Sequence, residues 1–247
     1  MLNISWFKSK YGKNWGDDLN PILASKLSNK NVQYIDFSND VEKYLLFIGS
    51  ILSMAGPLTS IYGSGFIHAD DVLSYMPKSI ISVRGPLTRN ILVKKYGIEC
   101  PEVYGDPSYL YKDYYKPINT DKKYKLGILP HYIDKKLPFL SKKVDGVKII
   151  DIQGDINTVI DDVNQCESII SSSLHGLIIS HMYNIPFKWV IMSNNVYGGD
   201  FKFKDWMGSC GFDDNAIFVD KVDVNYSKLT FLPDDFDTTL LKNVCPF

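Results

Sequence analysis

Residues 168–186 read SIISSSLHGLIISHMYNIP, and this stretch decides the fold class. The apolar run at 168–172 predicts a buried strand, and the pattern over 175–183 predicts a helix that begins directly after three serines. A strand that turns straight into a helix places backbone N–H groups, serine hydroxyls and the His175 imidazole at one helix N-terminus. Because the helix dipole is positive there, this arrangement favours an anion.

The candidate anion-binding residues of this stretch are Ser172, Ser173, Leu174, His175 and Gly176. The alternative is that the serines only cap the helix and that His175 is a structural histidine, because serine caps are common. His181 lies inside the predicted helix, and we expect a structural role for it.

Short apolar runs alternate with helical patterns on both sides of this stretch. Strands are predicted at residues 3–7, 32–37, 44–48, 60–62, 79–83, 126–129, 147–152, 168–172 and 187–192. Helices are predicted at residues 18–27, 86–96, 157–165, 175–183 and 204–210. Strands that alternate with helices are typical of parallel sheets. The sequence therefore predicts an α/β protein.

A change of composition divides the chain into two halves. Residues 111–125, YKDYYKPINTDKKYK, have no sustained periodicity and are predicted to form a surface linker. We expect one Rossmann-like domain at 1–122 and a second at 123–247, the second ending in a helical tail. Ligands of such folds bind outside the carboxyl ends of the strands, so a cleft between the halves is the expected site.

Composition excludes several classes of protein. The chain has 247 residues with 27 basic and 28 acidic side chains, and a net charge of -1 gives no long-range attraction to nucleic acid. Its four cysteines form no C-x-x-C pair, which disfavours a zinc ribbon, a redox dithiol or a disulfide framework. Only Arg84 and Arg89 are arginines, so these two positions stand out.

The N-terminus shows no secretory signal, and no apolar run approaches the roughly 20 residues that a membrane-spanning helix needs. We therefore expect a cytoplasmic protein.

Other candidate ligand-binding residues lie where predicted strands end. The loop NWGDDLNP (14–21) offers Asn14, Gly16 and Asp17, with a simple turn and helix cap as the alternative. Arg84 ends a strand, where its guanidinium is expected to point into the cleft and grip a carboxylate or phosphate. His131 follows another strand.

Weaker candidates complete this set. Residues 63–65, Gly63, Ser64 and Gly65, resemble part of a phosphate loop but lack its third glycine. Asp106 lies in a Gly-Asp-Pro turn and has a structural role as its alternative. Lys202 and Lys204 of FKFKDW (201–206) offer cations to the cleft, with surface solvation as the alternative. No Asp/His cluster has metal-ligand spacing, so no metal is expected.

Six motifs in order resemble the polysaccharide pyruvyl transferase family, and among its members the shorter ones of bacterial exopolysaccharide assembly. They are NWGD (14–17), YGSGF (62–66), SVRGPLT (82–88), YGDPSYL (104–110), LGILPHY (126–132) and SSSLHGLIISHMYNIP (171–186). The resemblance runs from about residue 14 to residue 205. It implies a two-domain fold like that of the B-type glycosyltransferases, phosphoenolpyruvate as the donor, and a sugar hydroxyl pair that becomes a cyclic pyruvate ketal.

The resemblance also implies roles for the candidate residues. His175 as an imidazolium would deliver a proton, and Arg84 would bind the donor anion, helped by Ser172, Ser173, Leu174, Gly176, His131 and Lys202 or Lys204. Many relatives carry arginine at the position of Ser173, so other cations must replace it here. The acceptor would enter near Asn14, Gly16, Asp17, Gly63, Ser64, Gly65 and Asp106.

No cofactor is expected beyond phosphoenolpyruvate as co-substrate. If the acceptor is a lipid-linked oligosaccharide, the protein would work at the inner face of the cell membrane as a peripheral protein. Two rival hypotheses stay open from the sequence: a glycosyltransferase that uses a nucleotide sugar, and a non-catalytic glycan-binding protein of capsule assembly.

Overall fold

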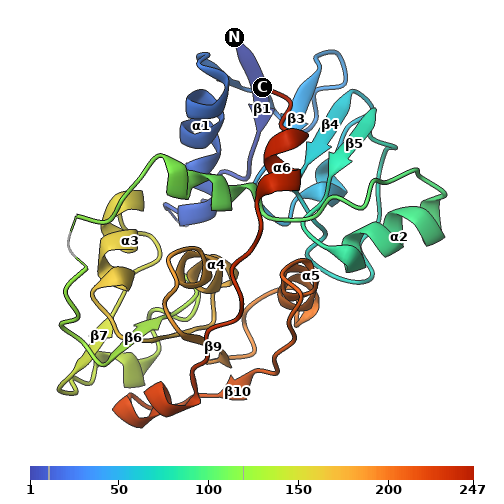
Figure 1. Cartoon of the computed structure of the whole chain (residues 1–247). Coiled ribbons are helices and arrows are strands. Elements are labelled where there is room, and N and C mark those ends of the chain that lie inside the picture. The colour runs from blue at the N-terminus through green and yellow to red at the C-terminus, as the bar shows by residue number, and fades with distance from the viewer. Residues whose placement is uncertain (11, 119) are drawn as a thin grey trace.

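Two parallel five-stranded sheets form the framework of the protein (Figure 1). The computed structural model describes residues 1–10, 12–118 and 120–247. The first sheet has the order β2-β1-β3-β4-β5, and its strands are β1 (Leu2–Ser5), β2 (Val32–Tyr34), β3 (Tyr44–Leu46), β4 (Thr59–Tyr62) and β5 (Ser79–Ser82). The two Rossmann-like α/β halves predicted from the sequence are confirmed.

The second sheet repeats the strand order of the first. Its order is β10-β9-β8-β6-β7, and its strands are β6 (Leu126–Leu129), β7 (Val147–Ile149), β8 (Ile169–Ser171), β9 (Phe187–Ile191) and β10 (Ile217–Phe218). In each half the first and third strands in chain order are neighbours, and the chain reverses its direction of winding between them. Ligands bind at such a switch point, which here means beyond β1 and β3 and beyond β6 and β8.

Helices cover both sheets, and their ends follow the sequence closely. They are α1 (Trp15–Ser28), α2 (Pro86–Tyr96), α3 (Ile156–Asn164), α4 (Leu174–Met182), α5 (Phe201–Ser209) and α6 (Thr239–Asn243). Short 3-10 helices are η1 (Leu52–Met54), η2 (Pro107–Asp113), η3 (Pro138–Ser141) and η4 (Val224–Leu229). Helix α2 has Pro86 at its first position and Gly97 as a left-handed C-cap at φ 64°, as the sequence predicts.

Helix α1 begins earlier than predicted and continues through a proline. It starts at Trp15 rather than at Asp18, so Gly16 and Asp17 belong to its first turn. Pro21 lacks the N–H that would bind the carbonyl of Asp17. Asn20 Nδ2 donates to that carbonyl instead, at 3.2 Å, which satisfies the oxygen that the proline leaves free.

One hydrophobic core joins the halves. The largest buried cluster includes Leu19 and Phe47 of the first half together with Ile160 and Leu177 of the second, and smaller clusters fill the outer face of each sheet. Trp15 is fully buried, and its indole Nε1 donates to the carbonyl of Ile156 at 3.1 Å. The halves therefore contact each other through packed side chains rather than across an open gap.

The predicted surface linker is wrong in part. Tyr111 of η2 is only 3% exposed, and Tyr115 donates from its hydroxyl to Asp161 of α3 at 2.8 Å. Tyr111 and Tyr115 therefore anchor the segment to α3 of the second half, while the lysines after them stay on the surface. Asn119, part of the predicted linker, lies outside the described residues.

The C-terminal tail returns to the first half. Figure 1 shows α6 lying in front of the first sheet. The Tyr62 hydroxyl of β4 donates to the carbonyl of Leu241 at 2.7 Å, and the ring of Phe247 lies 5.8 Å from that of Phe47. The end of the predicted second domain therefore packs on the first half, and the division into 1–122 and 123–247 stays a prediction.

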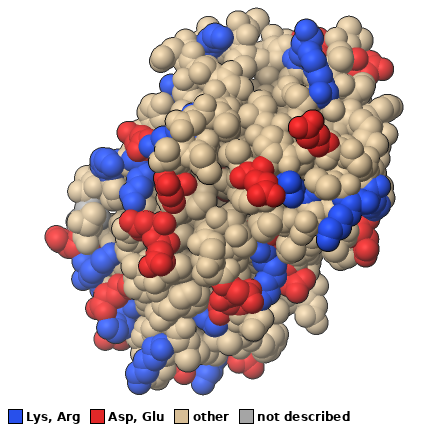
Figure 2. Space-filling view, turned by 45° about the vertical axis from the view of Figure 1, so that its right-hand side comes forward, with Lys and Arg blue, Asp and Glu red and all other residues tan. Residues whose placement is uncertain are grey.

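Charged side chains of both signs are interspersed on the face shown in Figure 2. That face carries no large patch of one sign. In the described part of the chain, no helix combines the length and apolar character that crossing a membrane requires.

Candidate functional site

A cavity of about 360 Å³ lies between the halves, at their facing switch points. The segments after β1 and β3 contribute Asn14, Asp17, Gly49, Ser50 and Ile51, and the segments after β6 and β8 contribute His131, Tyr132, Ser173, Leu174 and His175. Lys202 of α5 and Tyr197 from the segment before α5 complete much of the lining. The cavity therefore lies where the parallel-sheet rule expects a ligand to bind.

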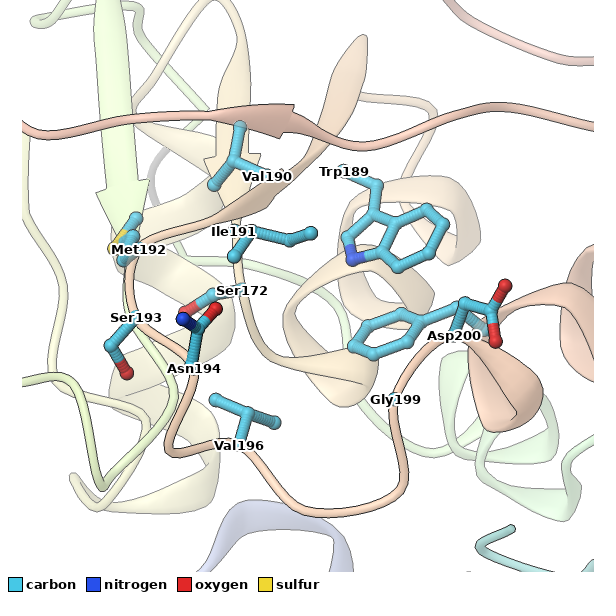
Figure 3. Close-up of a pocket in the computed structure, with 11 residues that line it drawn as sticks. Ser172, Trp189, Val190, Ile191, Met192, Ser193, Asn194, Val196, Gly199 and Asp200 are labelled. Carbon is cyan, nitrogen blue, oxygen red and sulfur yellow. The ribbon is translucent and has the colours of Figure 1, made fainter.

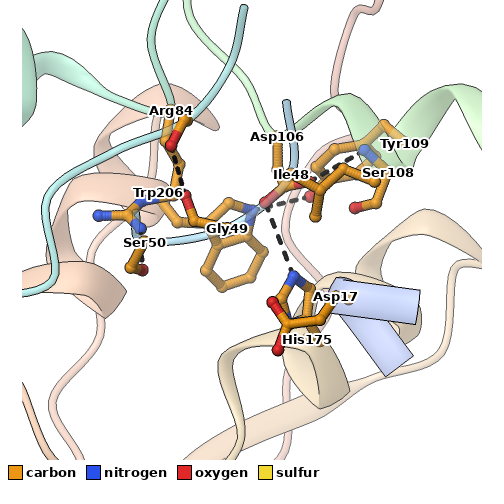
Figure 4. A network of polar contacts seen from close by, with 12 residues as sticks. Asp17, Ile48, Gly49, Ser50, Arg84, Asp106, Ser108, Tyr109, His175 and Trp206 are labelled. Carbon is orange, nitrogen blue, oxygen red and sulfur yellow. Dashed lines mark hydrogen bonds and ion pairs between the residues drawn. The ribbon is translucent and has the colours of Figure 1, made fainter. Parts of the chain in front are cut away.

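His175, in the first turn of α4, is held between the two halves. A Cβ on Gly16 of α1 would overlap the imidazole ring, so only glycine lets α1 approach this closely. On another side, Asp106 lies with its Oδ2 at 3.9 Å from Nε2 (Figure 4). Among the described residues, Nε2 has no hydrogen-bond partner at shorter range. The ring is therefore fixed in place, and 13% of the side chain remains exposed.

Burial lowers the pKa of both cavity histidines. Desolvation lowers the pKa of His175, and the charges of Lys202 and Arg84 lower it further, against the opposing effect of Asp106. For His131, burial, Lys202 and His175 lower the pKa to about 3. The lowered pKa favours a neutral imidazole at neutral pH, so the role of His175 as an imidazolium proton donor stays a prediction.

Lys202 brings a positive charge to this cavity. The side chain is 7% exposed, and Nζ donates to the carbonyl of Tyr197 at 3.0 Å. Burial and the nearby charge of Arg84 lower the pKa of its ammonium to about 8. At neutral pH the group is still largely charged, so a buried positive charge faces the cavity without a carboxylate bonded to it in the described part of the chain.

The N-terminus of α4 also faces the cavity. Ser173 is its N-cap and makes no side-chain capping bond, so the first N–H groups of the helix lack intrahelical acceptors. Ser172 differs from expectation, because its hydroxyl donates to Asp134 at 2.7 Å and accepts from the N–H of His131. The N–H of Ser173 is likewise taken by Ser171 Oγ, at 3.0 Å. Leu174 and Ser173 line the cavity, whereas Ser172 positions the His131 loop.

Asp17 and Asn14 form the opposite wall. Asn14 Nδ2 donates to Asp17 Oδ2 at 2.7 Å, and the Asp17 side chain is 7% exposed. Burial and the neighbouring charge of Asp18 raise the pKa of the Asp17 carboxyl to about 7. Both residues line the cavity as predicted, while Gly16 serves the packing of His175 and not the approach of a ligand.

Arg84 does not point into the cleft, and that expectation is wrong. It is fully buried, and its Nε and Nη2 lie 3.0 and 2.9 Å from Oδ2 of Asp205 on α5. Nη2 also donates to the carbonyl of Phe66 at 2.6 Å, and Nη1 donates to Ser50 (Figure 4). The guanidinium therefore joins the halves behind the cavity, and among its described hydrogen-bond partners Ser50 is the one that lines the cavity.

Three expected acceptor contacts are also structural. Gly63 packs against Pro107, Gly65 packs against the Arg84 guanidinium, and the Ser64 hydroxyl donates to the carbonyl of Gly49 at 2.9 Å. None of the three lines the cavity. The Gly-Ser-Gly motif therefore shapes the cavity through the Gly49 loop rather than touching a ligand.

Asp106, Lys204 and Gly176 differ from expectation too. Asp106 is 1% exposed, accepts from the N–H of Ser108 at 2.9 Å and faces His175, so it orients the histidine. Lys204 bonds to Asp213 at 2.6 Å on the surface. A Cβ on Gly176 would overlap Ser171 Oγ, so this glycine allows α4 to pack on β8.

A second, smaller cavity of about 210 Å³ lies beyond the end of β9 (Figure 3). Trp189 and Phe203 stack in its wall with ring centroids 4.6 Å apart. Ser172 lines this second cavity, whereas the next residue, Ser173, lines the main one.

Sequence reasoning missed Gly49, Ser50, Tyr197 and Asp205. Gly49 and Ser50 follow a predicted strand directly, so knowing which strand neighbours the first would have identified them. Asp205 carries no local signal in the sequence.

No group of three or more His, Cys, Asp or Glu side chains suited to a metal occurs among residues 1–10, 12–118 and 120–247.

The segment that holds the six motifs matches a known protein family. The family model described as polysaccharide pyruvyl transferase matches residues 14–194, from the start of the α1 wall to the segment after β9. The chain belongs to the polysaccharide pyruvyl transferase family. It is a transferase by this membership, and the recognition made from the six motifs is confirmed.

Two relatives of this pyruvyl transferase chain extend the comparison. An uncharacterized protein of Acanthamoeba polyphaga mimivirus is 30% identical over 243 residues, which cover 93% of this chain and 84% of that protein. The succinoglycan biosynthesis protein ExoV of Rhizobium meliloti (strain 1021) is 30% identical over 216 residues, or 83% of this chain. The chain covers 64% of that second protein, just under two thirds of its length.

Proposed function

We propose that this transferase moves the pyruvyl group of phosphoenolpyruvate onto two hydroxyls of a sugar, forming a cyclic ketal and releasing phosphate. Family membership supports the reaction class. The observation that carries the donor is the buried Lys202 ammonium, which faces one cavity together with the N-terminus of α4. A donor with a carboxylate and a phosphate needs positive charge and free N–H groups, and both are present here.

Lys202 takes over from the arginine that many relatives have at the position of Ser173. Ser173 and Lys202 line the same cavity although they lie on α4 and α5. A cation supplied from α5 leaves the small Ser173 side chain to make room at the helix N-terminus. The anion then lies among Lys202, Ser173 and Leu174, with neutral His131 available as a hydrogen-bond donor.

His175 is the group that handles the acceptor proton. A neutral imidazole with a lowered pKa accepts a proton from a hydroxyl more readily than it donates one. Asp106 behind the ring stabilises the imidazolium once it forms, and shortening of the 3.9 Å separation would strengthen this effect. The acceptor sugar enters from the Asn14 side of the cavity.

The acceptor belongs to a bacterial-type surface polysaccharide or its lipid-linked precursor. The named relative acts in succinoglycan biosynthesis, which supports a glycan acceptor. With a lipid-linked acceptor, the protein would work in the cytoplasm at the inner face of the membrane.

Removing the Lys202 charge tests the donor. Lys202→Met is expected to weaken phosphoenolpyruvate binding at least tenfold, because a neutral side chain cannot balance the donor's charge. Calorimetry at pH 7 measures binding. Lys204→Met on the same helix removes a surface lysine and should leave affinity within about twofold of wild type. Equal loss in both variants, or none in either, would contradict the assignment of Lys202.

Two measurements separate the rival functions. Stabilisation by uridine or guanosine diphosphate sugars, without stabilisation by phosphoenolpyruvate, would favour a nucleotide-sugar glycosyltransferase; the cavity beside Trp189 and Phe203 would then be its base site. Glycan binding without phosphate release from phosphoenolpyruvate would favour a non-catalytic protein.

A further inference from the structure

The carboxyl of Asp17 is buried in the cavity wall, and no cation of the described residues forms an ion pair with it. Among the described residues its one side-chain hydrogen bond comes from Asn14, which donates to Oδ2. A Cβ on Gly49 would lie 3.8 Å from Oδ1, so the absence of a side chain at Gly49 leaves room beside this oxygen. The carboxyl lines the cavity together with His175 and Lys202. A group that is only 7% exposed and opens into a substrate-sized cavity is placed to act on what the cavity holds.

Burial and the charge of Asp18 favour the neutral form of the Asp17 carboxyl. Asp18 follows it on α1 and adds a like charge, while Asn14 opposes this through its hydrogen bond. Across the cavity lie His131 and His175, both with lowered pKa, and the ammonium of Lys202 on α5. Burial is the largest effect and raises the pKa of Asp17 to about 7. Below that pH the carboxyl carries a proton, a state that surface aspartates reach only near pH 4.

We propose that Asp17 is the general acid of the pyruvyl transfer and protonates the methylene carbon of phosphoenolpyruvate. This assignment rests on the proposed function. The two proton transfers then use opposite walls of the cavity. His175, as a neutral imidazole, accepts a proton, and the protonated carboxyl of Asp17 donates one. An acid whose pKa lies near the working pH serves both directions of transfer.

The steps balance without any further reactant. Asp17 gives its proton to C3 of the donor, and C2 becomes electrophilic. The first acceptor hydroxyl bonds through oxygen to C2 and loses its proton to His175. The bond from C2 to the phosphate oxygen breaks, and phosphate leaves with the electron pair and takes the proton from His175. The second hydroxyl bonds to C2 and returns its proton to Asp17. One hydroxyl proton thus ends in the methyl group and the other on phosphate, with no oxidation or reduction.

The test compares Asp17→Asn with Asp18→Asn, a change of the same kind one residue further along α1. Asparagine keeps the size of the side chain and removes the transferable proton. Phosphoenolpyruvate binding is measured by calorimetry at pH 7 in two buffers of different ionisation enthalpy, which gives the protons taken up on binding. Phosphate release is measured with p-nitrophenyl glycosides of glucose, galactose and mannose as acceptors.

We expect Asp17→Asn to bind phosphoenolpyruvate within about threefold of wild type and to release phosphate at least 100-fold more slowly, as loss of a general acid does. Its proton uptake on binding should be smaller, because the donor's negative charge no longer draws a proton onto position 17. The variant should also have a higher Tm at pH 7, since it no longer buries an ionising carboxyl. Asp18→Asn should keep activity, with the alkaline fall of the rate moved to lower pH, because loss of its charge lowers the pKa of Asp17.

Three outcomes overturn the inference. Phosphate release by Asp17→Asn within threefold of wild type removes Asp17 as the acid and leaves the pyruvyl transfer standing. If no glycoside supports release, equal proton uptake by wild type and Asp17→Asn overturns it in the same way. Failure of the wild type to bind phosphoenolpyruvate overturns the proposed function and this inference together.

Discussion

Replacing Asp205 by alanine is expected to lower the free energy of unfolding by about 3–5 kcal/mol, because the change leaves the Arg84 guanidinium buried without its counter-charge. Asp205 Oδ2 accepts from Arg84 and from the Thr88 hydroxyl at 2.7 Å, and Oδ1 accepts from the Thr88 N–H at 2.8 Å. Both charged side chains are fully buried. Urea unfolding at pH 7 measures the effect, and a Tm lower by about 10 °C accompanies it.

Two control variants test whether the unpaired charge causes this loss of stability. The double variant Arg84→Met with Asp205→Leu removes both charges and should recover much of the lost stability, because apolar pairs of similar volume often replace buried ion pairs at little cost. Arg89→Lys alters the other arginine, whose partner Glu102 is exposed, and should change stability by under about 1 kcal/mol.

The same pair decides what Arg84→Lys should do. A guanidinium that pointed into the cleft, as the strand end suggests, would lose donor binding on this change. With the guanidinium bonded to Asp205, Ser50 and Phe66, the first effect of lysine is instead a loss of stability, because one ammonium cannot make all these bonds. A variant of normal stability that fails to bind phosphoenolpyruvate would restore the donor role.

The fold was predictable because buried parallel strands leave continuous apolar runs in the sequence. The runs at 126–129 and 168–172 coincide with β6 and β8 to within a residue, and Gly97 ends α2 where expected. The start of α1 was not predictable from Pro21, because the bond that keeps the helix intact comes from the Asn20 side chain. Propensity describes the backbone and cannot anticipate such a side-chain replacement.

Only the cavity residues that follow a predicted strand could be identified from the sequence. His131, Ser173, His175, Asn14 and Asp17 all follow predicted strands, and all line one cavity. Arg84 also ends a strand, yet its partner Asp205 lies 121 residues away in sequence. Which of two strand-end residues faces a ligand and which faces a buried carboxylate depends on the packing of α5 against α2. Gly85 permits this packing, because a Cβ there would overlap the backbone of Asp205.

His175→Ala is expected to lower the rate of phosphate release by about 100- to 10,000-fold, the range that a lost general base produces. The imidazole lines the cavity, and its pKa lies below the usual value, so the wild-type enzyme has a base ready at pH 7. Stability should fall less than for a histidine that also loses hydrogen bonds, because Nε2 has none among the described residues and the variant loses only the packing of the ring against Gly16 and Trp15. Phosphate release with saturating phosphoenolpyruvate, and the Tm, are the two measurements.

The other histidine of α4 is the matched control. His181 Nδ1 is 2.6 Å from the Tyr109 hydroxyl, Nε2 is 2.8 Å from the carbonyl of Asp234, and its ring packs edge-on against Phe187. His181→Ala should therefore lower the free energy of unfolding by about 2–4 kcal/mol while the folded fraction keeps its rate. If His175→Ala instead loses stability and keeps its rate, His175 is a packing residue, and the proton from the acceptor hydroxyl must pass to another group in the cavity.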